Sequence, residues 1–219
     1  MNESFGKNAD EKQEIINQFH RLYYNDRCQT WENTFWMGVP AQKCPLDLWI
    51  YQEIIYELKP DVIIETGTAS GGSVLFLASI CDIINNGKVI TIDIEDKKGR
   101  PEHERIKYLL GSSTSEESIR QIKKIIGSKV KVMVILDSDH SKDHVLNELR
   151  IYSEFVNMGS YIIVEDTNVN GHPVFQNHGQ GPMEAVEEFL NENNDFEIDK
   201  TKEKFYFTFN PYGYLKKIR

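Results

Sequence analysis

The stretch that most constrains the fold of this chain reads DVIIETGTASGGS, from Asp61 to Ser73. An apolar run over residues 62–64 lies between Pro60 and three glycines, a pattern typical of a buried parallel strand that enters a tight turn and then a helix. Glycine lets the backbone turn sharply and approach a ligand closely, and the free N–H groups at a helix start attract polar groups. No lysine follows the glycines, which excludes a phosphate-binding P-loop. The sequence therefore predicts a loop that binds a small molecule.

The carboxylate of Glu65 closes the predicted strand, where it suits a cationic ammonium group. The pattern Glu65-x-Gly67-x-x-x-Gly71 resembles the nucleotide-binding turn of class I methyltransferases, which use S-adenosylmethionine. A structural turn in any Rossmann-like fold is the alternative interpretation. Asp93 ends the next predicted strand, at a position where such folds bind ribose hydroxyls, although a solvated strand-end charge is also compatible. The predicted cofactor-binding residues are Glu65, Gly67, Thr68, Ser70, Gly71, Ser73, Asp93, Ser112, Ser113 and Asp137.

Length and composition predict a single globular α/β domain with an N-terminal appendage. The chain has 219 residues, and 27% of them are charged. A net charge of −9 opposes binding to a phosphate backbone, so we expect no nucleic-acid partner. The sequence contains no long apolar run and no recognisable signal peptide, and its three cysteines lack metal or redox spacing. We therefore expect no membrane partner, reduced thiols and a cytoplasmic location.

The first 45 residues are predicted to form a helical arm and a lid, and residues 46–219 the catalytic domain. Residues 10–25 carry apolar side chains at helical spacing. The segment Thr30–Pro40 is rich in aromatic side chains and is interrupted by Gly38 and Pro40. It suits a lid or substrate wall, and packing of the arm onto the domain explains it equally well. The apolar arm also makes a homo-oligomer plausible.

Strands and helices alternate along the rest of the chain, which predicts a doubly wound, mostly parallel seven-stranded sheet. Strands are expected at 62–64, 88–93, 106–110, 130–136 and 159–164, and closing antiparallel strands at 196–199, 205–209 and 214–218. The long polar segment 167–182 is expected to be a functional or mobile loop. Ligands of such sheets bind at the carboxyl ends of the strands. Acidic residues recur at these ends, namely Glu65, Asp93, Asp137, Glu165 and Asp166.

Asp137 and the adjacent pair Glu165-Asp166 are predicted to supply three oxygen ligands to one divalent cation. Hard cations such as Mg²⁺ prefer oxygen ligands, and three carboxylates packed together without a cation repel one another. Helix capping or ion pairing is the alternative role for one or more of them. A non-haem iron oxygenase instead needs two histidines and one carboxylate. His140 and His144 are the best such pair, and only His140 is expected at the strand end.

Several motifs together resemble the cephalosporin hydroxylase family, which is similar to metal-dependent O-methyltransferases. They are Gly38-Val-Pro-x-Gln-Lys, Asp137-Ser-Asp-His-Ser, Val164-Glu-Asp, Gly171-His-Pro and Gly181-Pro-Met-Glu-Ala-Val. The resemblance implies a class I methyltransferase fold, S-adenosylmethionine as cofactor, and Mg²⁺ on Asp137, Glu165 and Asp166. It also implies a general base at His140, and Asp139 is the expected partner that orients its ring. A helix cap or a partner of the metal carboxylates is the alternative role for His140.

The sequence thus predicts an S-adenosylmethionine- and Mg²⁺-dependent O-methyltransferase. Its expected acceptor is a hydroxyl group of a sugar or of another hydroxylated natural product. The alternatives are a metal-dependent hydroxylase or oxygenase of small molecules, and a module that binds a nucleotide without chemistry. The product separates these functions, because methylation adds a methylene unit to the mass, hydroxylation adds an oxygen, and a binding module adds nothing.

Overall fold

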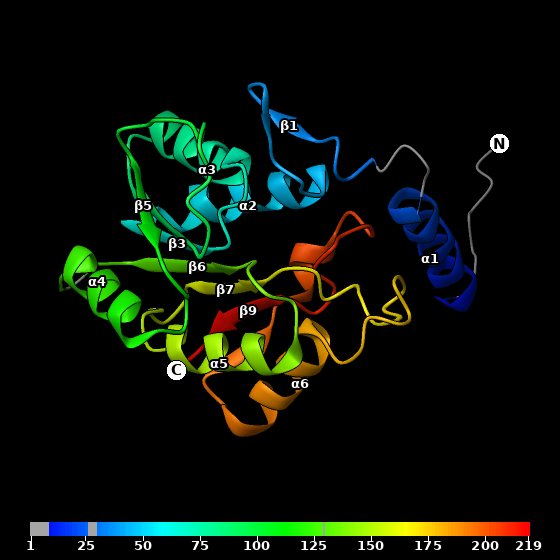
Figure 1. Cartoon of the computed structure of the whole chain (residues 1–219). Helices are drawn as coiled ribbons and strands as arrows, with labels where there is room; N and C mark the ends of the chain where they lie inside the picture. Colours follow the sequence, from blue (N-terminus) through cyan, green and yellow to red (C-terminus); the bar gives the residue numbers. More distant parts are fainter. Residues whose placement is uncertain (1–8, 26–29, 129) are drawn as a thin grey trace.

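The central element of the molecule is a seven-stranded sheet with the strand order β5-β4-β3-β6-β7-β9-β8 (Figure 1). This computed structural model describes residues 9–25, 30–128 and 130–219. The first five strands of the sheet are parallel, and β9 runs antiparallel to both of its neighbours. The strands are β3 (Val62–Thr66), β4 (Lys88–Asp93), β5 (Ile106–Leu110), β6 (Val132–Leu136), β7 (Tyr161–Val164), β8 (Phe196–Ile198) and β9 (Tyr214–Lys217). The predicted doubly wound, mostly parallel seven-stranded sheet is confirmed.

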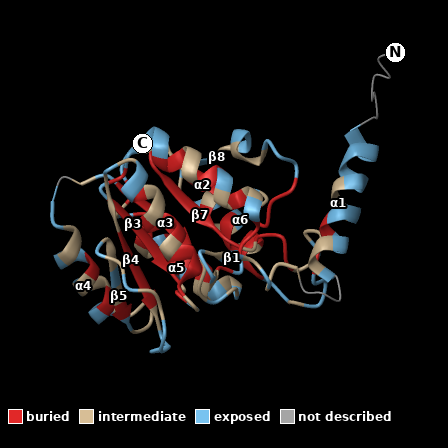
Figure 2. Cartoon of the chain, turned by 90° about the horizontal axis from the view of Figure 1, so that it is seen from above, coloured by how far each residue is buried: buried red, intermediate tan, exposed pale blue. Residues whose placement is uncertain are grey.

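Helices cover both faces of this sheet (Figure 1). Ile63 packs with α2 (Pro45–Leu58) and α3 (Gly72–Ile83), whereas Val62 and Ile64 pack on the opposite face. This follows from the alternation of side chains along a strand, and a strand buried on both faces needs a continuous apolar run. The opposite face is covered by α4 (Glu116–Ile126), α5 (Lys142–Tyr152) and α6 (Pro182–Glu192). Figure 2 shows the buried strands between partly exposed helices.

The strand order reverses between β3 and β6, and this reversal positions the site. From β3 the chain builds outward through β4 to β5, and then returns to place β6 on the other side of β3. The loops that leave β3 and β6 at their carboxyl ends therefore diverge to opposite faces, and a crevice opens between them. The glycine loop follows β3, and Asp137 follows β6.

The predicted strand over residues 205–209 is wrong. The chain instead forms a short 3₁₀ helix (Lys200–Glu203) and then an irregular segment before β9. In this segment the Phe209 N–H donates to Asp47 Oδ2 at 2.8 Å, and the Phe209 carbonyl accepts from the Asn168 N–H. The aromatic rings of Phe207 and Phe209 pack together and against the N-terminal helix. These contacts satisfy the backbone and the apolar side chains without a sheet ladder, which alternation in the sequence alone does not reveal.

The N-terminal region contains α1 (Ala9–Asn25) and a two-stranded hairpin of β1 (Phe35–Trp36) and β2 (Val39–Pro40). α1 confirms the predicted helix and lies to one side of the sheet (Figure 1). Trp36 packs edge-on against Phe76 of α3 and donates its ring N–H to Ser79 Oγ at 3.1 Å. A Cβ atom at Gly72 would lie 2.3 Å from the Pro40 carbonyl oxygen, so the hairpin rests directly on the start of α3. For Trp36, packing onto the domain is therefore the observed role.

Two of the three cysteines, Cys44 and Cys81, are buried free thiols, and Cys28 lies outside the described residues. Within the described ranges, no helix has both the length and the apolar character that crossing a membrane requires.

Candidate active site

The glycine loop is closed against the end of β4 by Asp93. Asp93 Oδ2 accepts hydrogen bonds from the backbone N–H groups of Thr68 and Ala69, at 3.1 and 2.9 Å, and pairs with Arg100 at 2.8 Å. A Cβ atom at Gly67, where φ is +82°, would lie 1.8 Å from the Asp137 carbonyl oxygen. Only glycine fits at this crossing of the loops after β3 and β6. Asp93 thus shapes the loop in addition to its predicted role with ribose.

A cavity of about 530 Å³ opens beside this loop, at the carboxyl ends of β3, β4, β5 and β6. It has the size of an ordinary small-molecule site. Among the predicted cofactor-binding residues, Gly67, Asp93, Ser112, Ser113 and Asp137 line it. Sequence reasoning did not assign its other lining residues to a cofactor, namely Ala69, Ile92, Ile94, Glu95, Gly111, Ser138, Asp139 and His144.

The remaining predicted cofactor residues lie in the loop and at the start of α3. The Thr68 and Thr91 hydroxyls are 2.7 Å apart, and Ser70 Oγ accepts from Lys97 Nζ at 2.9 Å. Ser73 is buried in the first turn of α3, which Gly71 precedes with φ at +87°. These residues support the loop, and they are not among those that line the cavity.

Glu65 is fully buried and retains an unused hydrogen-bonding atom. Its Oε2 accepts from the Thr91 hydroxyl at 3.0 Å, whereas its Oε1 has no hydrogen-bond partner within the described part of the chain. Burial raises the pKa of Glu65 to about 7, and the Lys43 ammonium group and the hydroxyls of Ser73 and Thr91 limit the rise. A buried carboxylate oxygen without a partner is costly, so this atom is suited to a hydrogen-bond donor on a ligand.

Asp137, His140 and Asp166 form the candidate metal centre. Each offers one ligand atom, and these atoms all lie within 4.8 Å of one another. β6 and β7 are adjacent and parallel, so the residues that follow them meet at one edge of the sheet. Burial raises the pKa of Asp137, and the nearby Lys43 ammonium group opposes this rise. Burial also raises the pKa of Asp166, and the nearby His140 opposes it. Two carboxylates held together in this way favour a cation between them.

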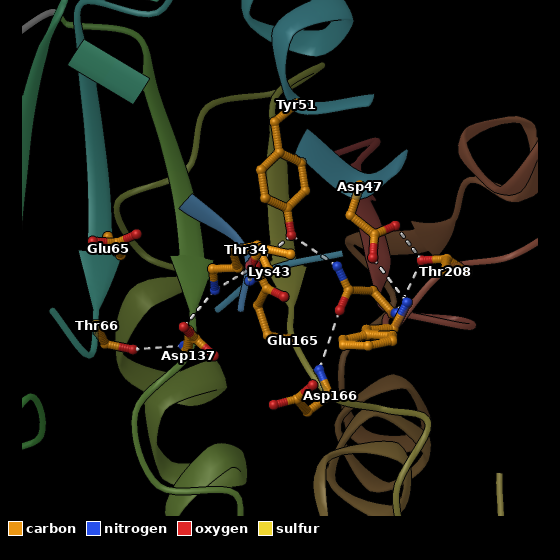
Figure 3. Close-up of polar contacts among 12 residues, drawn as sticks. Thr34, Lys43, Asp47, Tyr51, Glu65, Thr66, Asp137, Glu165, Asp166 and Thr208 are labelled. Carbon is orange, nitrogen blue, oxygen red and sulfur yellow. Dashed lines mark hydrogen bonds and ion pairs between the residues drawn. The ribbon is translucent and has the colours of Figure 1, made fainter. Parts of the chain in front are cut away.

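Glu165, the third predicted metal ligand, belongs to a neighbouring group around Lys43 (Figure 3). The Lys43 ammonium group contacts Asp137 Oδ2 and lies 2.8 Å from Glu165 Oε1. Tyr51 OH donates to the same Glu165 oxygen. The side chains of Lys43 and Glu165 are both 3% exposed, so this pair is almost completely removed from water. Sequence reasoning gave Lys43 no role, although it ends the Gly38-Val-Pro-x-Gln-Lys motif.

His140 lies where the sequence predicts a base, but its partner differs from the expected one. Its Nε2 is 3.3 Å from Asp166 Oδ2, and about a third of its side chain remains exposed. Asp139, the expected orienting residue, instead accepts a hydrogen bond from the Ser141 N–H at 2.8 Å and so closes the turn into α5. The ring of His140 is therefore held toward the candidate metal centre by a residue of the next strand end.

His144 is separate from this centre. Its Nε2 lies 3.1 Å from the hydroxyls of both Ser113 and Ser138 and 3.5 Å from the buried Glu148. The hydrogen bond to Glu148 raises the pKa of His144. Among the described residues, the candidate metal group therefore has one histidine and two carboxylates, which is not the two-histidine set of the iron oxygenases.

Comparison with known proteins adds an independent line of evidence. The family model described as Rhamnosyl O-methyltransferase/CmcI matches residues 28–218. A rhamnosyl O-methyltransferase of Mycobacterium leprae is 39% identical over 207 residues, which are 92% of this chain and 90% of that protein. One from Mycobacterium tuberculosis is 38% identical over 92% of this chain and 84% of its own length.

Similar solved structures include CmcI without ligand and CmcI with Mg and SAM, with TM-scores of 0.67 and 0.65. Each is 20% identical to this chain and covers 86% of it, and the match spans 77% and 78% of those chains. An O-methyltransferase from Bacillus cereus with SAH has a TM-score of 0.55 and 15% identity, over 89% of this chain and 84% of its own. These likenesses support the fold.

Proposed function

The chain belongs to the Rhamnosyl O-methyltransferase/CmcI family of O-methyltransferases, and we therefore propose that it methylates a hydroxyl group of a sugar or of another hydroxylated natural product. The proposed methyl donor is S-adenosylmethionine, and the proposed metal is Mg²⁺ or a similar divalent ion. The observation that carries the proposal is the meeting of two sites at one edge of the sheet. Asp137 both lines the cavity beside the glycine loop and belongs to the candidate metal group.

The cavity and the glycine loop beside it fit S-adenosylmethionine, which supplies an electrophilic methyl group when bound. Glu65 is buried in β3, just before the loop, and its Oε1, which has no hydrogen-bond partner within the described residues, would accept from the amino group of the methionine part. Asp93 lines the cavity and would accept from ribose hydroxyls. Ser112 and Ser113 line the same cavity and would contact the adenine ring. The loop residues Thr68, Ser70, Gly71 and Ser73 would hold the turn in the shape that these contacts need.

The acidic side of the site fits a hard divalent ion, which lowers the pKa of a bound hydroxyl group. We propose that Asp137 and Asp166 are its main ligands and that Glu165 is the third carboxylate of the site. His140 would accept the proton of the acceptor hydroxyl at a ring nitrogen, in the role of a general base. Contact with Asp166 would keep the ring beside the reacting oxygen.

A sugar acceptor is supported by the named activity of the relatives that are 38–39% identical to this chain. The test is to incubate the protein with S-adenosylmethionine labelled in its methyl group and with rhamnosides that carry free hydroxyl groups. We expect labelled product that is heavier by one methylene unit, and little of it in excess chelator. A product heavier by one oxygen would contradict the proposal in favour of a hydroxylase, and saturable donor binding without product would favour a binding module.

A further inference from the structure

A buried ammonium group lies among the carboxylates of the candidate metal site. Lys43 contacts Asp137 and Glu165, and its side chain is 3% exposed. Both contacts are ion pairs with carboxylates, so Lys43 places a positive charge inside an otherwise acidic site.

The backbone of Lys43 is fixed as firmly as its side chain. Its N–H donates to Thr34 Oγ1 at 3.0 Å, and the Thr34 carbonyl accepts from the Ala41 N–H at 2.8 Å. The hairpin between these residues rests on the start of α3. The hairpin thus positions Lys43 so that its side chain reaches the site, and Figure 3 shows the ammonium group between Asp137 and Glu165.

This position matters because the ammonium group and a divalent ion would use the same oxygens. Lys43 Nζ is within hydrogen-bonding distance of one oxygen of Asp137 and of one oxygen of Glu165. A divalent ion held by these carboxylates would lie close to the ammonium group, and two positive charges at short range repel each other. The ammonium group and the ion therefore compete for the carboxylates of Asp137 and Glu165.

We propose that Lys43 is a positioning residue that acts as the built-in counter-ion of the metal site. In the metal-free protein it neutralises Asp137 and Glu165 and holds both carboxylates in place. It competes with the divalent ion for them, and so it weakens metal binding while it keeps the fold independent of the metal. This inference rests on the metal site of the proposed function.

The test compares the metal-free wild-type protein with Lys43→Met, which keeps the length of the side chain and removes the charge. Titration with MnCl₂ and with MgCl₂ is followed by calorimetry, and thermal unfolding is measured with and without the ion. We expect Lys43→Met to bind the ion about 10- to 100-fold more tightly, because a repelling positive charge beside the ion is lost. We also expect it to unfold at a lower temperature without the ion and to regain most of this loss with it, whereas the wild type changes little.

Two controls isolate the charge. Lys43→Arg keeps the charge and should not bind the ion more tightly than the wild type. Lys123→Met makes the same chemical change on an exposed face of α4 and should leave both readouts unaltered. If Lys43→Met folds only when the ion is present, the inference is supported in its strongest form.

Three outcomes overturn the inference. If Lys43→Met binds the ion more weakly than the wild type does, the lysine strengthens metal binding instead of competing with it. If Lys43→Met stays unfolded at saturating ion, or if the ion does not restore its lost stability, the role of Lys43 is purely structural. If the wild-type protein binds no divalent ion, the metal is removed from the proposed function and this inference fails with it. Methylation itself is tested separately, by label transfer from S-adenosylmethionine.

Discussion

Burial sets the charge of the acidic residues on which the proposed function depends. Glu65 illustrates this, because it is fully buried and its pKa is raised to about 7. Near neutral pH the carboxyl group therefore exists in both protonation states. Only the ionised state attracts the ammonium group of a bound methionine moiety strongly.

The first prediction is that the affinity for S-adenosylmethionine increases with pH between about 5.5 and 7.5. Because the free carboxyl group must lose its proton before it binds the ammonium group, affinity should change by up to about 10-fold per pH unit below the pKa and level off above it. Calorimetric titrations at several pH values measure this. Glu65→Gln should bind more weakly and should lose the pH dependence. A wild-type affinity that is constant over this range would remove Glu65 from the ammonium site.

The second prediction concerns His140, which is placed beside Asp166 at the candidate metal centre. If its ring accepts the acceptor's proton, His140→Ala should lose about 10²- to 10⁴-fold in kcat and keep its affinity for S-adenosylmethionine and for the metal. Single-turnover rates and calorimetry give these values separately. The matched control is His103→Ala, because His103 pairs with Asp82 away from the site and should be dispensable. A loss of metal affinity in proportion to the loss of rate would instead make His140 a metal ligand.

At the scale of the elements, the segment 167–182 is a long loop that is braced from within. Glu184, in the first turn of α6, accepts hydrogen bonds from Asn170 Nδ2 at 2.8 Å and from the Gly181 N–H at 2.7 Å. His172 Nε2 lies 3.0 Å from the same carboxylate. Burial alone raises the pKa of Glu184, but these hydrogen bonds overcome it and lower the pKa to about 2. The carboxylate of Glu184 thus holds residues near both ends of the loop against α6, which favours a fixed wall over a mobile lid.

The third prediction is that Glu184→Ala mobilises this loop. Three hydrogen-bonding groups lose their shared acceptor, so hydrogen exchange of residues 170–181 should accelerate and KM for the acceptor should increase. Affinity for S-adenosylmethionine should stay close to that of the wild type, because the cavity lining does not include this loop. Glu187→Ala, on an exposed position of the same helix, is the control. Unchanged exchange in Glu184→Ala would show that other contacts hold the loop.

At the scale of the whole molecule, much of the fold and part of the site followed from the sequence. Apolar runs that end in carboxylates predicted which strand ends would meet, and Asp137 and Asp166 do meet because β6 and β7 are adjacent and parallel. Lys43 could not be placed in this way, because it lies 94 positions from Asp137 and reaches the site through the packing of a hairpin. The predicted strand at 205–209 does not form, because Phe207 packs against His20 of α1 and the Phe209 backbone N–H donates to Asp47.

The arrangement of the whole chain also suggests what α1 contributes. Its one buried side chain, His20, contacts Asn168 at 2.9 Å and stacks on Phe209, and Arg21 donates to the Pro173 carbonyl oxygen at 3.4 Å. These contacts reach the loop after β7 and the segment before β9. The cavity beside the glycine loop is lined by residues from 67 onward, so its lining includes no part of α1.

The last prediction follows from this division of contacts. Deleting residues 1–29 removes α1 and leaves the hairpin with Lys43 in place, so the sheet and the donor site should stay folded. We expect nearly wild-type affinity for S-adenosylmethionine, together with a clear loss of kcat/KM for the acceptor, because the loop that contains Asn168 loses its packing partner. Calorimetry, thermal unfolding and steady-state kinetics on the truncated chain separate these effects. If folding and donor binding fail together, residues 1–29 belong to the structural core of the catalytic domain, and a role for α1 confined to the acceptor side is wrong.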